Sequence, residues 1–103
     1  MINLLEETIK ELNNNGKDIQ DVLWVGCEDD GYMSWNDFEK NANFLYDNGY
    51  GGEEIKVDLI IVGKDFWLER MDYDGSEWWS FKTTPEKPIQ KCKNFVRAIR
   101  YGE

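Results

Sequence analysis

The 103-residue sequence contains no histidine, only two cysteines and only two prolines. Without histidine, no Ser-His-Asp or Cys-His arrangement for nucleophilic catalysis can form. Cys27 and Cys92 cannot supply a usual structural zinc site by themselves, and they are too few for a secreted disulfide scaffold. We therefore predict a protein that is not an enzyme, needs no metal or cofactor, and keeps both thiols reduced in a cytosol.

Long apolar runs and targeting signals are also absent. The longest apolar runs, such as residues 59–62, are far too short to cross a membrane. The first residues lack the basic and apolar regions of a signal peptide, which predicts a cytoplasmic protein. Hydrophobic residues make up 41% of the chain and aromatic residues 15%. A disordered acidic segment would be poorer in aromatic residues, so we predict one folded domain over residues 1–103.

Basic residues are few, and they are unevenly placed. The chain has 12 basic and 21 acidic residues, for a net charge of −9. The first 81 residues hold six basic and 19 acidic residues, which gives −13, and the remaining 22 residues carry +4. Because a large net charge repels itself in the compact state, folding does not require this excess. It indicates a positively charged partner.

Three amphipathic helices are predicted from apolar residues spaced three and four positions apart. The first spans about residues 2–12 and ends at Gly16, the second runs from Ser34 to Asn48, and the third covers residues 89–99. Their apolar stripes are Ile2, Leu5, Ile9 and Leu12; Trp35, Phe38, Ala42 and Leu45; and Ile89, Cys92, Val96 and Ile99. The basic face of the third helix suits neutralisation of nearby acids better than nucleic acid, which the acidic segment would repel.

Strands are predicted at residues 21–27, 57–62, 66–73 and 77–83. The run at 57–62 is nearly all apolar, which predicts a central strand covered on both faces. The order α-β-α-β-β-β-α indicates an α+β fold, an antiparallel β-meander with helices packed on one face.

Asp74-Gly75 is a strong signal for a two-residue hairpin turn, and it fixes the register of the last two strands. Tyr73 then faces Ser76. The predicted core face pairs Leu68 with Phe81 and Arg70 with Trp79, and the other face pairs Trp67 with Lys82 and Met71 with Trp78. This second face is either covered by a helix or a binding patch, since aromatic and Met residues are enriched at interface centres.

The segment from Asp30 to Asp37 resembles the second half of an EF-hand loop. Counting Gly31 as the sixth position puts Gly26 first, where a carboxylate belongs, and Asp37 twelfth, in place of the bidentate Glu. We therefore predict no metal site, but a tight turn that leads into a capped helix. Clustered carboxylates elsewhere are expected by chance in so acidic a chain and indicate no acid–base catalysis.

The hairpin sequence from Tyr73 to Lys82, with residues 21–26, 59–63 and 66–70, resembles small uncharacterised phage and prophage proteins. The resemblance covers about residues 21–84 and is most specific in the tryptophan-rich hairpin. It implies a viral or mobile-element setting, where small acidic proteins include inhibitors of host defence such as anti-CRISPR proteins and DNA mimics. It implies no known activity and no catalytic residue.

We expect an inhibitor whose carboxylates replace phosphates on a basic nucleic-acid-binding surface of a host protein, such as a CRISPR effector, without binding nucleic acid or membrane itself. The candidate contacts are residues expected on exposed loops beside the hairpin: Glu28, Asp29, Asp30, Asp72, Asp74, Glu77 and Trp78. One alternative is a small-ligand or nucleotide-binding module with an aromatic pocket of Trp67, Trp78 and Tyr50. Another is an accessory phage protein without an inhibitory role.

Overall fold

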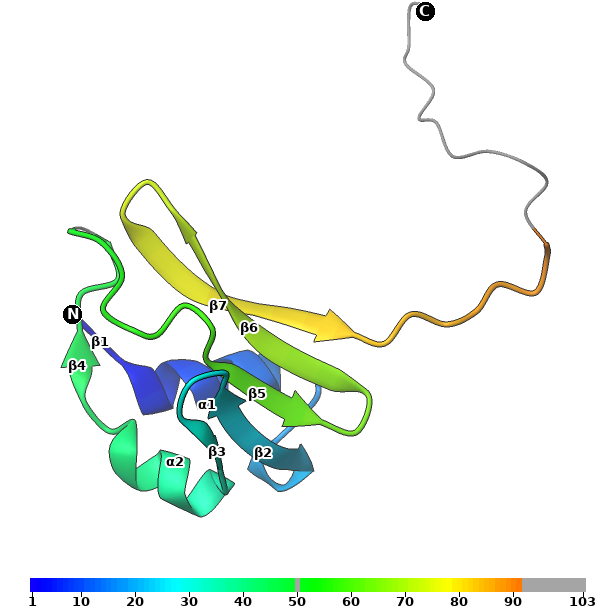
Figure 1. Ribbon diagram of the computed structural model, residues 1–103, viewed down its shortest axis with the longest axis horizontal. Coiled ribbons are helices and arrows are strands. Elements are labelled where there is room, and N and C mark those ends of the chain that lie inside the picture. The colour runs from blue at the N-terminus through cyan, green and yellow to red at the C-terminus, as the bar shows by residue number, and fades with distance from the viewer. Residues whose placement is uncertain (50, 92–103) are drawn as a thin grey trace, which may run out of the picture.

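The computed structural model describes residues 1–49 and 51–91 (Figure 1). Tyr50 and the part of the predicted third helix from Cys92 onward lie outside these residues. Residues 84–91 belong to no helix or strand. No helix in the described part of the chain combines the length and the apolar character needed to cross a membrane.

The first helix, α1, spans Leu4–Asn14 and confirms the first predicted helix with a shift of two residues. Its start is capped by Asn3, whose side chain accepts a hydrogen bond from the Glu6 backbone N–H. At its end, Gly16 has a φ of +75°, and the N–H groups of Gly16 and Lys17 donate to the carbonyls of Asn13 and Leu12. This is the Schellman motif, which glycine favours because it has no Cβ.

Five strands form an antiparallel sheet in the order β3-β2-β5-β6-β7. Their bounds are Val22–Cys27 for β2, Gly31–Met33 for β3, Ile60–Gly63 for β5, Phe66–Tyr73 for β6 and Ser76–Thr83 for β7. A short 3-10 helix, Ile19–Asp21, precedes β2. The fold is therefore of the α+β class, as predicted. Strand β3, where the sequence predicted only a turn and an approach to a helix, was missed.

The β6–β7 hairpin has the predicted register. Tyr73 pairs with Ser76, Arg70 with Trp79 and Met71 with Trp78. Asp74 and Gly75 have φ values of 51° and 87°, and positive φ at both turn residues is typical of the type I′ turn. The local turn sequence thus sets the pairing of every residue in two eight-residue strands.

The second helix, α2, spans Trp35–Asn41 and is capped by Ser34, whose hydroxyl accepts from the Asp37 N–H at 3.2 Å. The prediction that it continues to Asn48 is wrong. The chain instead forms β4, Leu45–Tyr46, which pairs with β1, Ile2–Asn3. Leu45 is exposed, whereas Tyr46 is buried and donates its hydroxyl hydrogen to Glu7 of α1 at 2.6 Å. These long-range contacts outweigh the local helical pattern.

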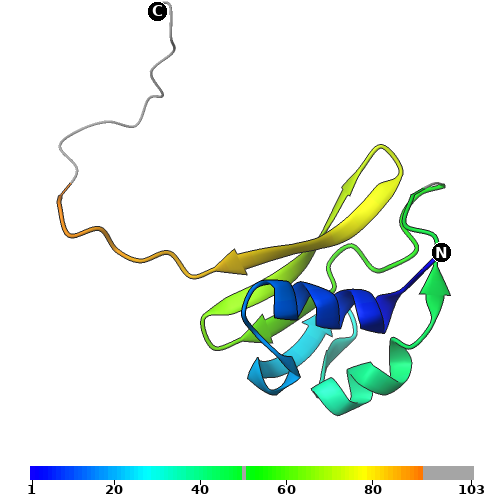
Figure 2. The same cartoon turned by 180° about the vertical axis from the view of Figure 1, so that it is seen from behind.

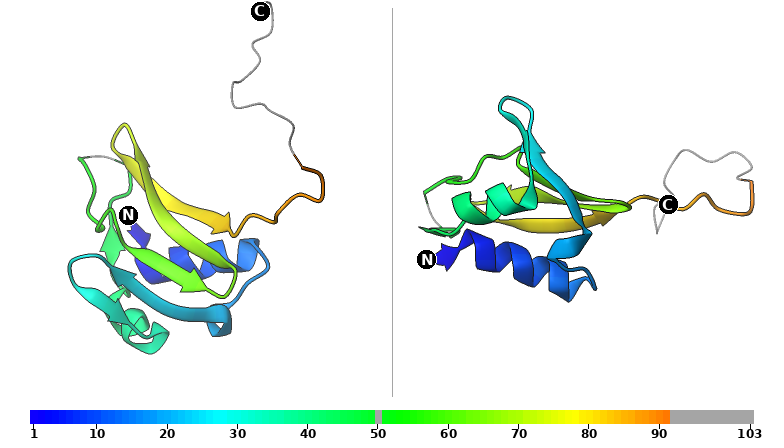
Figure 3. Two further views of the ribbon diagram at one scale, coloured as in Figure 1. Left: turned by 45° about the vertical axis from the view of Figure 1, so that its right-hand side comes forward. Right: turned by 90° about the horizontal axis from the view of Figure 1, so that it is seen from below.

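Helix α1 lies on one face of the sheet, and α2 packs beside β2 (Figures 2 and 3). Trp79 of β7 donates its indole N–H to the hydroxyl of Thr8 on α1 at 2.8 Å, and both side chains are buried. The core between the layers consists chiefly of Leu4, Leu12, Val25, Trp35, Phe38, Tyr46, Ile55, Ile61, Phe66, Leu68 and Trp79. The helices cover one face of the sheet, as predicted.

The opposite face of the sheet is covered by no helix of the described chain. Strand β5 is central, as predicted, but it begins at Ile60 rather than Val57, which is 64% exposed. Ile60 and Val62 point to this opposite face and are only partly buried. The prediction that this strand is covered on both faces is therefore wrong for the described residues, because both described helices lie elsewhere.

Candidate interaction surface

The directions of the strands bring two acidic turns to the same end of the sheet. Strands β2 and β6 both run antiparallel to β5, which lies between them, so they run parallel to each other. The β2–β3 turn, residues 28–30, and the β6–β7 turn, residues 74–75, therefore leave the sheet at the same end. This end of the sheet, with the loop described next, is called the acidic end.

The loop of residues 47–58 leads into β5 from the same end. It is hydrogen-bonded to the β2–β3 turn and to strand β7. The Glu28 N–H donates to Asp58 at 3.0 Å, which joins the loop to the β2–β3 turn. At the hairpin, the Glu77 N–H donates to the Asn48 carbonyl at 2.8 Å. Three segments that are distant in the sequence thus lie at the same end of the sheet and are joined by hydrogen bonds (Figure 1).

The acidic end gathers carboxylates that are exposed or partly exposed. They include Glu28, Asp29, Asp30, Glu53, Glu54, Asp58, Asp72 and Asp74. Lys56 is the basic side chain among them, and its ammonium group lies 2.9 Å from Asp30. The hydrogen bond from Lys56 lowers the pKa of Asp30, and the same bond raises the pKa of Lys56. One lysine therefore neutralises only a small part of the local charge.

The tip of the β6–β7 hairpin projects beyond the rest of the acidic end. Ile60, at the start of β5, pairs with Glu69, so β6 continues for four residues to Tyr73 beyond its neighbour. At about 3.3 Å per residue, the hairpin tip projects roughly 13 Å past the start of β5. Phosphates along one DNA strand rise about 3.4 Å each. The hairpin tip, which carries Asp72 and Asp74, thus projects by a length over which several phosphates of one DNA strand rise.

Glu77 was expected on an exposed loop, but it is buried, with 2% of its surface exposed. One of its oxygens lies 3.0 Å from the Arg70 guanidinium, and its carboxylate also accepts from the N–H groups of Glu54 and Ile55. Register explains the error, because Glu77 shares a face with Trp79, the core face. Glu77 holds the loop in place and is not part of the exposed surface of the acidic end.

Arg70 is the centre of this buried network. Its guanidinium donates to the Tyr46 hydroxyl at 3.0 Å, lies 3.6 Å from Glu7, and stacks over the Trp79 ring at 4.7 Å, as the sequence predicted. Nε and Nη1 of Arg70 have no hydrogen-bond partner among the described residues. The bonds through Glu77 connect the sheet to the loop of residues 47–58 and so position the acidic end.

Tyr46 shares this environment, and its pKa is raised. Burial of the side chain is the main cause, and the hydrogen bond to Glu7 adds to it. The interaction with Arg70 opposes the shift only in part. Tyr46 therefore remains a neutral donor between α1 and the sheet.

The face of the sheet opposite α1 is called the outer face, and it carries a band of apolar side chains. By register, its members are Trp24, Tyr32, Ile60, Val62, Trp67, Met71 and Trp78. Trp78 is 40% exposed, so this candidate contact does lie on a surface of the described chain. Gly26 permits the packing of Trp24, because a Cβ at Gly26 would lie only 3.0 Å from the Trp24 ring.

The aromatic pocket expected from Trp67, Trp78 and Tyr50 is not formed by the two tryptophans that the structure describes. Trp67 of β6 pairs with Lys82 of β7, and Trp78 lies four residues before Lys82 on β7. At about 3.3 Å per residue, they are roughly 13 Å apart along the hairpin. The indole N–H of Trp67 instead donates to Glu69 at 3.1 Å.

The segment with partial EF-hand character adopts no calcium loop. Residues 31–33 form β3, Asp30 is turned toward Lys56, and the Asp37 N–H is bonded to the Ser34 cap. Among the described residues, no group of three or more Asp, Glu or Cys side chains is arranged to hold a metal ion.

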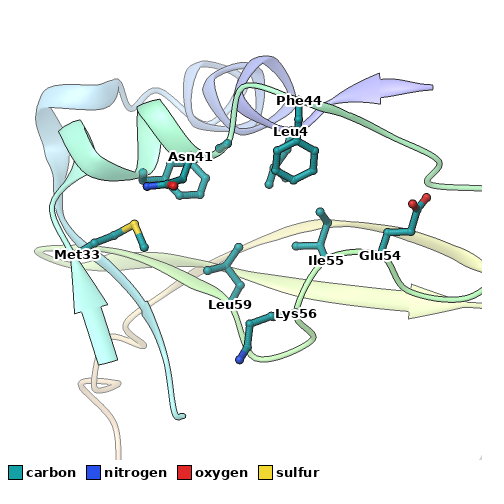
Figure 4. Close-up of a pocket in the computed structure, with 10 residues that line it drawn as sticks. Leu4, Met33, Asn41, Phe44, Glu54, Ile55, Lys56 and Leu59 are labelled. Carbon is teal, nitrogen blue, oxygen red and sulfur yellow. The ribbon is translucent and has the colours of Figure 1, made fainter. Parts of the chain in front are cut away.

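An apolar pocket lies between the helix layer and the loop before β5 (Figure 4). Its volume is about 230 Å³. Leu4 and Phe44 line it from the helix side, and Met33, Ile55 and Leu59 line it from the opposite side. Asn41, Glu54 and Lys56 supply its polar groups.

No family model, curated protein or solved structure matches the chain. These comparisons therefore identify no enzyme family and no enzyme fold for it. The candidate site is therefore defined by the geometry of the described residues alone.

The structure brings together five of the seven sequence-predicted contacts at the acidic end: Glu28, Asp29, Asp30, Asp72 and Asp74. Trp78 lies on the outer face, and Glu77 is buried. Sequence analysis missed Glu53, Glu54 and Asp58, whose position follows only from the direction of β5.

Proposed function

We propose that the protein is a small acidic binding protein that occupies a basic nucleic-acid-binding surface of another protein. The observation that supports this is the meeting of three acidic segments at one end of the sheet. Their carboxylates would take the place of phosphates, and the charge would speed association with a basic partner in a salt-dependent way. Exposed side chains beside the tip, such as Trp78, would add apolar contact.

The resemblance of the hairpin to small phage proteins favours a particular kind of partner. A phage-type inhibitor acts in the cytoplasm of its host, and a host defence protein with a nucleic-acid groove, such as a CRISPR effector nuclease, fits the charge of the acidic end. An accessory protein whose acidity serves solubility alone would not need its carboxylates gathered at one end. The clustering therefore supports the inhibitor over the accessory role.

The test is a pair of double variants with the same change in charge. Asp72→Asn/Asp74→Asn removes two carboxylates from the acidic end, and Glu39→Gln/Glu86→Gln removes two exposed ones from α2 and from the segment after β7. Each protein is used as bait in a bacterial lysate, and duplex DNA is added as competitor. We expect the first variant alone to lose capture of a nucleic-acid-binding protein that DNA and salt release from the unmodified bait. Equal loss or equal capture by both variants would overturn the proposal.

The apolar pocket supports a second candidate, a module for a small uncharged apolar ligand. Its lining is mostly apolar, with a few polar groups at the edge, which is the usual composition of ligand pockets. The polar groups include both Glu54 and Lys56, so no strongly anionic ligand is favoured. Mass spectrometry of the purified protein under native conditions would detect a retained ligand. Its loss in Ala42→Phe, which fills the pocket, would separate this candidate from the first.

A further inference from the structure

The apolar pocket and the acidic end share the loop that leads into β5. Within this loop, Ile55 is buried, and its neighbours Glu54 and Lys56 are exposed. Ile55 and Leu59 line the pocket, while Glu54 belongs both to the edge of the pocket and to the acidic end. A molecule that binds at the acidic end therefore comes within reach of the pocket.

The pocket is open at its edge. Phe44, which is 43% exposed, and Glu54, also exposed, lie among its lining residues together with the buried side chains of Leu4, Phe38 and Ile55. Figure 4 shows Phe44 and Ile55 on opposite sides of the same space. A side chain from outside can therefore enter the pocket without separating the helices from the sheet.

The wall that the loop contributes is held in place by hydrogen bonds. The N–H groups of Glu54 and Ile55 donate to the buried carboxylate of Glu77 at 2.8 and 3.3 Å. The carboxylate of Glu54 in turn accepts from the Asp47 N–H at 2.7 Å. A site that is already ordered loses less conformational entropy when it binds. The pocket is therefore formed before any occupant arrives.

The size of the pocket favours one side chain over a separate ligand. Its volume is about 230 Å³, whereas pockets that enclose small molecules usually measure roughly 300–1,000 Å³. Binding energy in protein interfaces is concentrated in a few large side chains that fill well-packed pockets. The volume and the apolar lining suit such an anchor.

The charge beside the pocket indicates what surrounds the anchor. Glu53, Glu54 and Asp58 lie on the loop that forms this side, and the one lysine there, Lys56, is paired with Asp30 at 2.9 Å. Basic residues next to the anchor would complement these carboxylates. A second copy of the chain would instead bring its own net charge of −9 to the same place.

We propose that the pocket receives one large apolar side chain of the protein partner, from a segment whose neighbouring residues are lysine and arginine. The apolar side chain lies between Phe44 and Ile55, and its basic neighbours contact Glu53 and Glu54. This inference rests on the proposed function, because the same basic partner occupies the acidic end. It adds that charge alone does not complete the recognition.

The experiment compares two short synthetic peptides on the full chain. Both have lysine and arginine on either side of a central residue, which is phenylalanine in one and alanine in the other. Binding is measured by fluorescence anisotropy at low and high salt. We expect the phenylalanine peptide to bind about tenfold tighter or more, which is the effect of one anchor residue. The protein is the same in both titrations, so this result does not depend on the folding of a variant.

A matched pair of variants assigns the advantage of phenylalanine to the pocket. Phe44→Asn makes one wall polar, and Leu45→Asn changes the adjacent residue, which is 61% exposed and does not line the pocket. We expect Phe44→Asn to remove the difference between the two peptides and Leu45→Asn to keep it. In the natural protein, NMR should show shifts of the Ile55 and Leu59 methyl signals with the phenylalanine peptide only.

The outcomes separate this inference from the proposed function. Equal, salt-sensitive binding of both peptides would overturn the inference and leave the acidic end as a binding surface, whereas no binding of either peptide at low salt would count against both. Methyl shifts that depend on protein concentration alone would make a second copy the occupant and overturn the inference. A retained small molecule that the phenylalanine peptide does not displace would overturn it as well.

Discussion

The two faces of the β6–β7 hairpin are built from alternating residues of the same strands, yet they differ sharply. The inner face carries Arg70 and Trp79, both buried, and the outer face carries Met71 and Trp78, both well exposed. A charged residue, Arg70, is thus buried, while a tryptophan, Trp78, is exposed. The difference shows that burial in this protein is decided by which face α1 and the loop of residues 47–58 cover, and not by the hydrophobicity of the single residue.

Removal of the buried cation should have the largest effect on stability. Arg70→Ala leaves Glu77 and Glu7 without their counter-charge, and loss of one partner of a buried ion pair costs about 3–5 kcal/mol. Lys82→Ala is the control, because it removes an exposed cation that lies 3.9 Å from Glu69 on the outer face, where such pairs contribute less than about 1 kcal/mol. Urea unfolding measures both. Similar losses would mean that the inner network contributes no more than a surface pair.

Alanine substitutions of the neighbouring residues Trp78 and Trp79 compare the packing of the two faces directly. Trp79→Ala empties a buried site and removes the donor to Thr8, so we expect a loss of about 3–5 kcal/mol in the free energy of unfolding. Trp78→Ala, one residue away, should cost about 1 kcal/mol, because the side chain is partly exposed. If calorimetry finds equal losses, the two faces are packed equally well, and the contrast drawn above fails.

Tyr46 links α1 to the inner face, and its removal should have a moderate effect. Tyr46→Phe removes the hydrogen bonds to Glu7 and Arg70, at a cost of about 1–3 kcal/mol because Arg70 stays buried. Burial and the bond to Glu7 raise the pKa of Tyr46 above the value near 10 of an unfolded tyrosine.

The raised pKa also predicts a pH dependence. Folding favours the protonated hydroxyl, so its contribution is fully present below about pH 10 and is lost as the pH rises from there through the folded pKa. Stability measured by urea unfolding on both sides of this pH should fall more steeply in the natural protein than in Tyr46→Phe. Parallel curves would show that Tyr46 does not titrate differently in the folded state.

The smallest effect is expected at the hairpin tip, where neither face is packed. Asp74→Asn keeps a side chain that tolerates the positive φ of 51°, so stability should change by less than about 0.5 kcal/mol. Gly75→Ala, at a φ of 87°, should cost about 1 kcal/mol or more. Thermal unfolding distinguishes them. A large loss in Asp74→Asn would indicate a stabilising role for that carboxylate and would weaken its use as a free contact.

Local sequence was sufficient for part of this fold. The Asp74-Gly75 turn and the alternation around it predicted the hairpin register correctly, including the stacking of Arg70 on Trp79. Helix α1 followed from its stripe and its glycine cap. In both cases the determining residues lie within a few positions of one another, so the pattern contains the necessary information.

Long-range contacts were not predictable in the same way. Helix α2 ends early because Tyr46 is drawn to Glu7 and Arg70, which lie far away in the sequence. The burial of Glu77 was accessible in principle, since the correct register already placed it on the face of Trp79. The gathering of Glu53 and Asp58 with the two acidic turns required the directions of β2, β5 and β6, which no single segment reveals.

Strand β7 lies at the edge of the sheet, and this has a consequence for pairing with other chains. In a two-residue hairpin whose end pair is Tyr73 and Ser76, the amides of Glu77, Trp79 and Phe81 point away from β6. The Asn48 carbonyl accepts from the Glu77 amide, and no strand of the described chain pairs with the others. Unpaired edge amides are a template for strand addition. By occupying the first of them, Asn48 restricts the registers in which a foreign strand can extend this sheet.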